Sequence, residues 1–79
     1  MMDATESAIE AILFASGDPM PGARIALVLG VEVSEIFEAA RRLSAYYSEN
    51  ARGIRLVRLG DSLQLCSAPE HGRSITQAM

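Results

Sequence analysis

The sequence predicts a mainly α-helical domain with a small β-hairpin, in the order of a winged helix-turn-helix: three helices followed by a two-stranded wing. Apolar residues recur at helical spacing in three successive segments, and Gly17 and Gly30 stand where the first two of these end. An apolar stretch centred on Gly60 follows the third segment and is typical of a hairpin. The 79 residues leave room for one core, so we expect a single domain over residues 1–79.

The first helix is expected over residues 4–16. Asp3 is placed to accept hydrogen bonds from the first turn, and Glu6 three residues later completes a capping-box pattern. The stripe expected to face the core consists of Thr5, Ile9, Ile12, Leu13 and Ser16. Phe14 falls outside this stripe, so either another element covers it, which we favour, or it belongs to a contact surface.

Two more helices are expected after the proline-containing turn DPMPG, which should be extended because residues before proline avoid the helical region. The first of them, over residues 22–29, should bury Ile25, Val28 and Leu29. The longer one, over residues 33–48, should form most of the core. Its buried stripe is expected to be Val33, Ile36, Ala40, Leu43 and Tyr47, with Phe37 at the edge and Tyr46 outside.

The hairpin is expected over residues 54–59 and 63–67, joined through the turn GDS. Leu56 and Val57 are adjacent apolar residues, which breaks the alternation of a half-buried strand. Either the strand contains a bulge or both of its faces are partly covered. Residues 68–79 could add one short helical turn, or begin something that this chain does not contain.

The charged residues argue against a surface built for nucleic acid. Ten acidic residues outnumber seven basic ones, all of them arginine, for a net charge of −3. The outer side of the longest helix would turn Glu35, Glu38 and Glu49 toward a polyanion, and Arg42 there is expected to pair with Glu38 four residues earlier.

A DNA-binding transcriptional regulator remains the alternative. Its possible nucleic-acid contacts would be Arg41, Arg52, Arg55 and Arg58, the last three of them on or beside the wing. The competing explanation is that charge on a two-stranded edge keeps the edge soluble and prevents uncontrolled strand pairing.

No pattern of catalytic, metal-binding or cofactor-binding residues is visible. Cys66 and His71 are the only residues of their types, so neither has a partner with which to bind a metal. We expect Cys66 to be a buried or half-buried thiol and His71 to be exposed. Charge interrupts the N-terminal apolar stretch, and no stretch is long enough to cross a membrane, so we expect a soluble intracellular protein that is not an enzyme and has no cofactor.

Three stretches carry a resemblance to a known family: IEAILFASGDPM, IALVLGVEVSEIFEAARRL and YYSENARGIRLVRLGDSLQLCSAPE. From about Ala8 to Glu70 the sequence resembles the N-terminal winged-helix domain of segregation and condensation protein B (ScpB). The most telling pieces are residues 13–19, 29–30 and 52–54. Pro21 and Glu32 depart from the family at helix starts where it usually has Ser, Thr or Asp, which weakens the helix caps and not the core pattern.

The resemblance implies a non-enzymatic adaptor of the bacterial SMC complex, which acts in chromosome condensation and segregation and thereby in the cell cycle and cell division. It also implies a cytoplasmic, nucleoid-associated homodimer that binds a central segment of the kleisin, segregation and condensation protein A (ScpA), and through it SMC. Members of the family have two winged-helix domains in tandem, of which we expect this chain to contain the first and not the second. The resemblance predicts neither direct DNA binding nor membrane binding.

A homodimer needs a self-complementary surface, and apolar residues left over from the core are the candidates for it. We expect the dimer interface among Phe14, Tyr46, Leu56 and Val57, and we expect Phe37 to belong to the core. A charged residue in place of Tyr46 or Val57 should then weaken self-association without loss of helical content.

Overall fold

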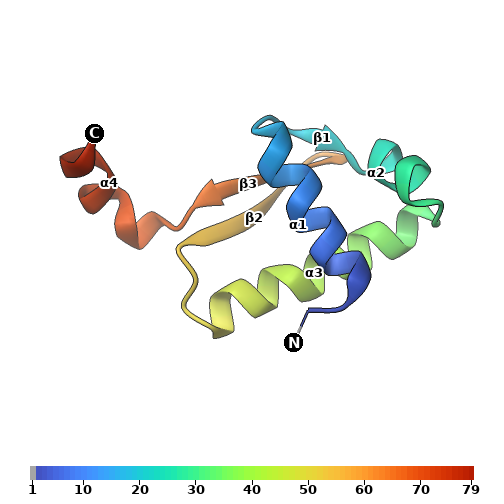
Figure 1. Cartoon of the computed structure of the whole chain (residues 1–79), viewed down its shortest axis with the longest axis horizontal. Coiled ribbons are helices and arrows are strands. Elements are labelled where there is room, and N and C mark those ends of the chain that lie inside the picture. Colours follow the sequence, from blue (N-terminus) through green and yellow to red (C-terminus); the bar gives the residue numbers. More distant parts are fainter. Residues whose placement is uncertain (1) are drawn as a thin grey trace.

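The computed structural model describes residues 2–79 and confirms the predicted fold class (Figure 1). The elements in chain order are α1 (Ala4–Ser16), β1 (Met20–Pro21), α2 (Gly22–Leu29), α3 (Val33–Glu49), β2 (Ile54–Leu59), β3 (Ser62–Ser67), the 3-10 turn η1 (Pro69–His71) and α4 (Gly72–Ala78). The helices α1 and α2 have the predicted bounds. The helix α3 ends one residue later, and β3 begins one residue earlier, than predicted.

The wing is a three-stranded antiparallel sheet in the order β1-β3-β2, and not the two-stranded hairpin that the sequence predicted. Met20 pairs with Leu63, and Pro21 pairs with Ser62. A proline is tolerated in β1 because β1 is an edge strand. The backbone N–H of Gly22 then donates to the carbonyl of Asp61 over 2.9 Å, which attaches the start of α2 to the hairpin turn.

The hairpin has an uninterrupted register, from Ile54 opposite Ser67 to Leu59 opposite Ser62. The broken alternation at Leu56 and Val57 is therefore not due to a bulge. Both side chains are half-buried, so each face of the hairpin is partly covered, as the second of the two explanations required.

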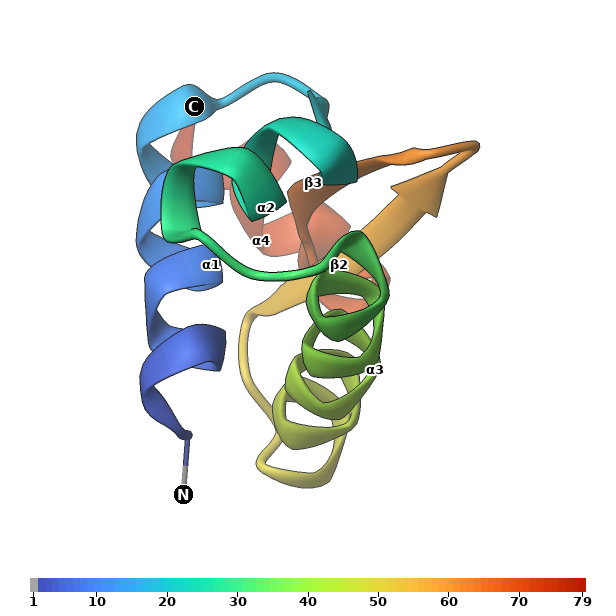
Figure 2. The ribbon, with the colours of Figure 1, turned by 90° about the vertical axis from the view of Figure 1, so that its right-hand side faces the viewer.

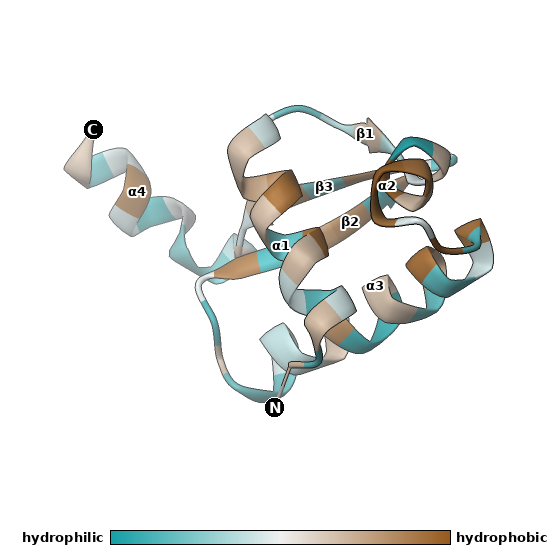
Figure 3. Ribbon diagram, turned by 45° about the vertical axis from the view of Figure 1, so that its right-hand side comes forward, coloured by the Kyte–Doolittle hydropathy of each residue, from teal (hydrophilic) through white to brown (hydrophobic). Residues whose placement is uncertain are grey.

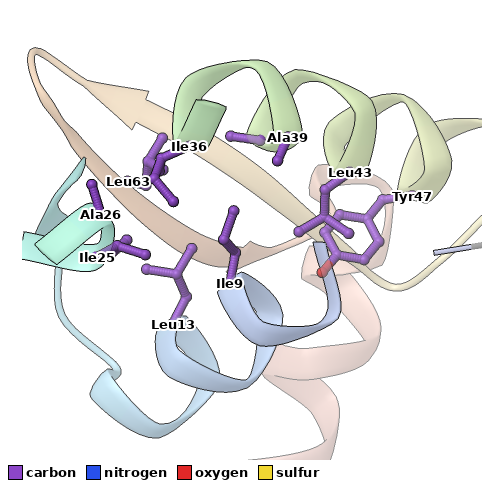
Figure 4. Packing of buried hydrophobic residues seen from close by; sticks show 10 residues of the cluster. Ile9, Leu13, Ile25, Ala26, Ile36, Ala39, Leu43, Tyr47 and Leu63 are labelled. Carbon is purple, nitrogen blue, oxygen red and sulfur yellow. The ribbon is translucent and has the colours of Figure 1, made fainter. Parts of the chain in front are cut away.

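The core lies where α1, α2 and α3 meet the inner face of the sheet. Figure 4 shows side chains from all three helices and from β3 pointing toward one another. The largest fully buried side chains are Ile9, Leu13, Ile25, Ile36, Leu43, Tyr47 and Leu63. At this centre the predicted stripes of α1 and α3 are confirmed.

At the rim of the core, three expectations were wrong. Val28 is 69% exposed and Val33 is also exposed, while Ala26 and Ala39 are buried instead. The short helix α2 packs only one narrow side against the core. Val33 is the first residue of α3 and lies at the rim of the core. Phe14 is 82% exposed, so no other element within residues 2–79 covers it.

The predicted capping box of α1 is present, and it also joins α1 to α3. The Asp3 carboxylate accepts from the backbone N–H of Glu6 over 2.8 Å, and this hydrogen bond and the nearby Arg42 guanidinium hold the pKa of Asp3 below its usual value. Arg42 Nε donates to Glu6 Oε2 over 2.8 Å, and its Nη2 lies 3.4 Å from Asp3 Oδ2. The predicted pairing of Arg42 with Glu38 is therefore wrong, because Arg42 pairs with the two acids of α1 instead.

The C-terminal helix α4 projects away from the rest of the domain (Figure 1). It contains no buried residue. The sequence left two possibilities open here, one short helical turn or the beginning of a further element, and the structure has η1 followed by the seven residues of α4.

Candidate binding grooves

Two apolar grooves lie on the domain, one between α3 and the hairpin and one between α1 and the hairpin. The first, which we call the α3 groove, lies between α3 and the hairpin and has a volume of about 510 Å³. Its lining residues are Phe37, Ala40, Arg41, Ser44, Ala45, Ser48, Leu56, Arg58 and Leu63. The small residues contributed by α3 leave the space, and the sheet supplies the apolar floor.

A stacked arginine and aromatic ring form one end of the α3 groove. The guanidinium carbon of Arg58 lies 4.1 Å from the centre of the Phe37 ring, a cation–π contact. Phe37 is half-buried and packs against the core, so the expectation that it belongs to the core is met in part. Gly22 allows the ring this position, because a Cβ atom on Gly22 would lie 2.6 Å from the ring.

The second groove, which we call the α1 groove, lies between α1 and the far end of the hairpin and has a volume of about 520 Å³. Its lining residues are Glu10, Ala11, Leu13, Phe14, Gly17, Arg52, Ile54, Leu65, Cys66 and Ser67. The exposed Phe14 ring forms part of its wall, and Cys66 is half-buried, as expected. A groove with a large exposed aromatic side chain in its wall is suited to protein contact, since aromatic residues are enriched at the centres of interfaces.

The carboxylate of the α1 groove is fixed by a residue of α3. The Tyr47 hydroxyl donates to Glu10 Oε2 over 2.7 Å. Burial, and then this hydrogen bond, raise the pKa of the Tyr47 hydroxyl well above its usual value, so the group stays protonated and remains a donor. This hydrogen bond positions the Glu10 side chain at the groove, and Arg52 supplies a guanidinium in the same lining.

The four candidate interface residues do not form one surface. Phe14 lines the α1 groove, and Leu56 lines the α3 groove. Val57 neighbours Leu56 in β2 and therefore points to the other face of the sheet. Tyr46 packs partly against the core, edge-on to Tyr47 with ring centres 6.3 Å apart.

The wing arginines are largely engaged within the domain. Arg55 is only 25% exposed, and its guanidinium binds the carbonyls of Arg52 and Ile54 and, over 2.8 Å, Glu70 Oε2. Arg58 stacks on Phe37 and donates to the carbonyl of Gly60 over 2.8 Å. Within residues 2–79, Arg41 and Arg52 are the two of the four predicted nucleic-acid contacts that form no ion pair.

In a DNA-binding winged helix the first turns of this helix enter the major groove. In this chain the first turns of α3 present no basic side chain. Residues 33–40 contain no arginine or lysine, and Glu35 and Glu38 are exposed there. Beside them α2 exposes Leu27, at 82%, and Val28 together with one basic residue, Arg24, and most of its ribbon is brown in Figure 3. Carboxylates and apolar side chains are poor partners for a phosphate backbone, so this end of the domain does not suit base readout.

Across residues 2–79, no three His, Cys, Asp or Glu side chains gather in a way that could hold a metal ion. In the same part of the chain, every helix is too short or too polar to cross a membrane. His71 lies exposed in η1.

Comparison with known families gives a consistent match. The family model described as "Segregation and condensation complex subunit ScpB" matches residues 7–79. The curated "Segregation and condensation protein B" of Desulforamulus reducens is 31% identical over 68 residues, which cover 86% of this chain and 38% of the relative. Its counterpart in Caldanaerobacter subterraneus subsp. tengcongensis is 35% identical over 74 residues, which cover 94% of this chain and 44% of the relative. The chain thus spans less than half of these relatives.

Solved structures show the same similarity. A crystal structure described as a dimer of the ScpB N-terminal domain complexed with ScpA peptide is 32% identical, with a TM-score of 0.86, and the match covers 94% of this chain and 93% of that one. ScpB from Mycobacterium tuberculosis has a TM-score of 0.90 at 13% identity, over 99% of this chain and 49% of that one. The second match shows a shared fold alone.

Proposed function

Because this chain belongs to the segregation and condensation protein B family, we propose that it is a non-enzymatic adaptor domain that joins two copies of itself and binds a kleisin segment. In this role it would support a bacterial SMC–kleisin complex in chromosome condensation and segregation, in the cytoplasm and at the nucleoid. The family description is that of a complex subunit, and the similar crystal structure is described as a dimer with a ScpA peptide. We further propose that the chain is the first of two winged-helix domains of the whole protein.

The composition of the α1 groove is the observation that supports the proposed self-association. A two-fold dimer requires one patch to fit a second copy of itself. The α1 groove combines an exposed apolar anchor, Phe14, with a carboxylate at Glu10 and a guanidinium at Arg52. When two such grooves face each other, each Phe14 can enter the partner's groove while Glu10 of one copy approaches Arg52 of the other.

Among the candidate interface residues, Phe14 is the one that this arrangement places at the centre. Tyr46 and Val57 remain proposed contributors, and their substitution by a charged residue tests them individually. Leu56 lies in the α3 groove and would join the interface only if the dimer extended across the sheet.

Direct DNA binding is not part of the proposal. Two of the three wing arginines are engaged within the domain: Arg55 binds backbone carbonyls and Glu70, and Arg58 stacks on the Phe37 ring, so releasing them would break those contacts. The exposed side of α3 carries carboxylates, which repel phosphate.

Two parallel titrations test the function. A fluorescently labelled ScpA peptide and a labelled DNA duplex are each titrated with the full chain at low salt, and anisotropy is followed. We expect saturable binding of the peptide and none of the duplex up to roughly 50 µM protein, a range that covers most non-specific DNA binders. Binding of the duplex that weakens steeply with salt, with no binding of the peptide, would contradict the adaptor and favour the regulator.

A further inference from the structure

We propose that the α3 groove binds a partner segment in which apolar anchor residues are flanked by carboxylates. This inference rests on the proposed adaptor function. It specifies the place on the domain where the kleisin segment binds and the chemistry of that binding. The occupant is a short amphipathic segment of another protein, neither a second copy of this chain nor a nucleic acid.

The floor of the α3 groove fits apolar side chains. Leu56 and Leu63 of the sheet and the ring of Phe37 form its base, and Ala40 and Ala45 line the helix side. Small residues on one helix leave a channel into which larger side chains of a partner can pack. Ala45 is exposed, so the channel is open along α3.

The charge of the α3 groove has one sign. Its lining contains Arg41 and Arg58 and no acid. Asp61, which pairs with Arg58 over 3.7 Å, is 96% exposed at its side chain, so it offsets the charge of that arginine weakly. Arg58 is held in place by the Phe37 ring, which presents the guanidinium at the groove at little further entropic cost.

This single sign of charge selects the occupant. Two copies of the α3 groove would bring arginine against arginine, so the surface is not self-complementary, whereas the α1 groove contains both Glu10 and Arg52. The apolar floor between the arginines does not suit a phosphate backbone. An amphipathic segment with Asp or Glu beside its apolar anchors satisfies both the floor and the rim.

The test uses two groove variants and two matched controls. Ala45→Glu fills the channel with a longer side chain, at an exposed helical position, whose negative charge repels the carboxylates of the partner segment. Arg41→Glu reverses the charge of the rim. Ala23→Glu and Arg24→Glu make the same two changes at exposed positions of α2, outside both grooves. Each full chain is titrated into labelled ScpA peptide, and circular dichroism and sedimentation record its helical content and its oligomeric state.

We expect both groove variants to weaken peptide binding about tenfold or more, with helical content and self-association unchanged, and both controls to bind as the unaltered chain does. Replacing the carboxylates of the peptide by amides should lower its affinity for the unaltered chain. The same replacement should lower its affinity for the Arg41→Glu variant much less. Peptide binding that survives both groove variants would overturn the groove assignment and leave the adaptor function standing. A peptide that the unaltered chain does not bind would overturn both.

Discussion

Tyr47 connects the core to the α1 groove, because its ring is fully buried and its hydroxyl donates to Glu10 in the groove lining. Its place in the buried stripe of α3 was predicted correctly, but its hydroxyl donates to Glu10, 37 positions away, and sequence spacing cannot indicate such a pair. The capping box of Asp3 and Glu6 was predictable because both of its hydrogen bonds lie within one helical turn. The ion pairs from Arg42 to these residues span 36 and 39 positions, and the nearer Glu38 was therefore chosen wrongly.

Tyr47→Phe removes one hydroxyl from a buried position and leaves the ring in place. We expect the free energy of unfolding to fall by about 1 kcal/mol, the net contribution of a hydrogen bond of this kind. Urea unfolding followed by circular dichroism measures it. Glu10 should also become more mobile at the α1 groove, so self-association should weaken slightly; an unchanged free energy of unfolding would show that the hydrogen bond contributes nothing net.

Asp3→Asn tests the charge at the start of α1. Folding lowers the pKa of Asp3 below 3.8. The folded state is therefore more stable with the charged carboxylate than with the protonated one. The stability that this charge contributes is complete above pH 3.8 and is lost as the pH falls through the lowered value. Urea midpoints should therefore favour the unaltered chain at neutral pH and converge with those of Asp3→Asn in strong acid. A gap that is the same at every pH would show that charge is not its cause.

At the scale of elements, α2 shows what hydrophobic periodicity does not decide. Its eight residues are apolar on nearly every side, so the pattern could not distinguish the side that packs, at Ile25 and Ala26, from the exposed side at Leu27 and Val28. The strand β1 was missed for a related reason. Two residues beside a proline carry no strand signal, and their pairing depends on where the hairpin turn lies.

Gly22→Ala tests how closely α2 approaches α3. Alanine favours a helix over glycine by about 1 kcal/mol, but its Cβ would lie 2.6 Å from the Phe37 ring and would have to displace it. We expect a net loss of stability in urea unfolding, together with weaker binding at the α3 groove. Gly72→Ala in α4 is the matched control, since a Cβ there has open space and should leave stability unchanged or raise it. Equal effects of the two substitutions would contradict the close contact.

At the scale of the whole molecule, the order of elements and the centre of the core followed from the sequence, whereas the grooves did not. Helix caps, glycine stops and apolar stripes are local signals, and they predicted α1, α2, α3 and the hairpin nearly to the residue. The grooves depend on how α1 and α3 lie against the sheet, as the end-on view of Figure 2 illustrates for α3. Phe14 was placed among the interface candidates because it lay outside the core stripe, and only the fold shows that it borders a groove.

The proposed adaptor function depends most on the α1 groove as the surface that joins two copies of the chain, and sedimentation equilibrium tests this directly. Phe14→Asp places a charge at the proposed centre, and Leu27→Asp places the same charge at a leucine of the same 82% exposure outside both grooves. We predict a dimer for the unaltered chain and for Leu27→Asp, and a monomer for Phe14→Asp at the same concentration, with helical content retained. A dimer that survives Phe14→Asp, or an unaltered chain that sediments as a monomer, would contradict the account.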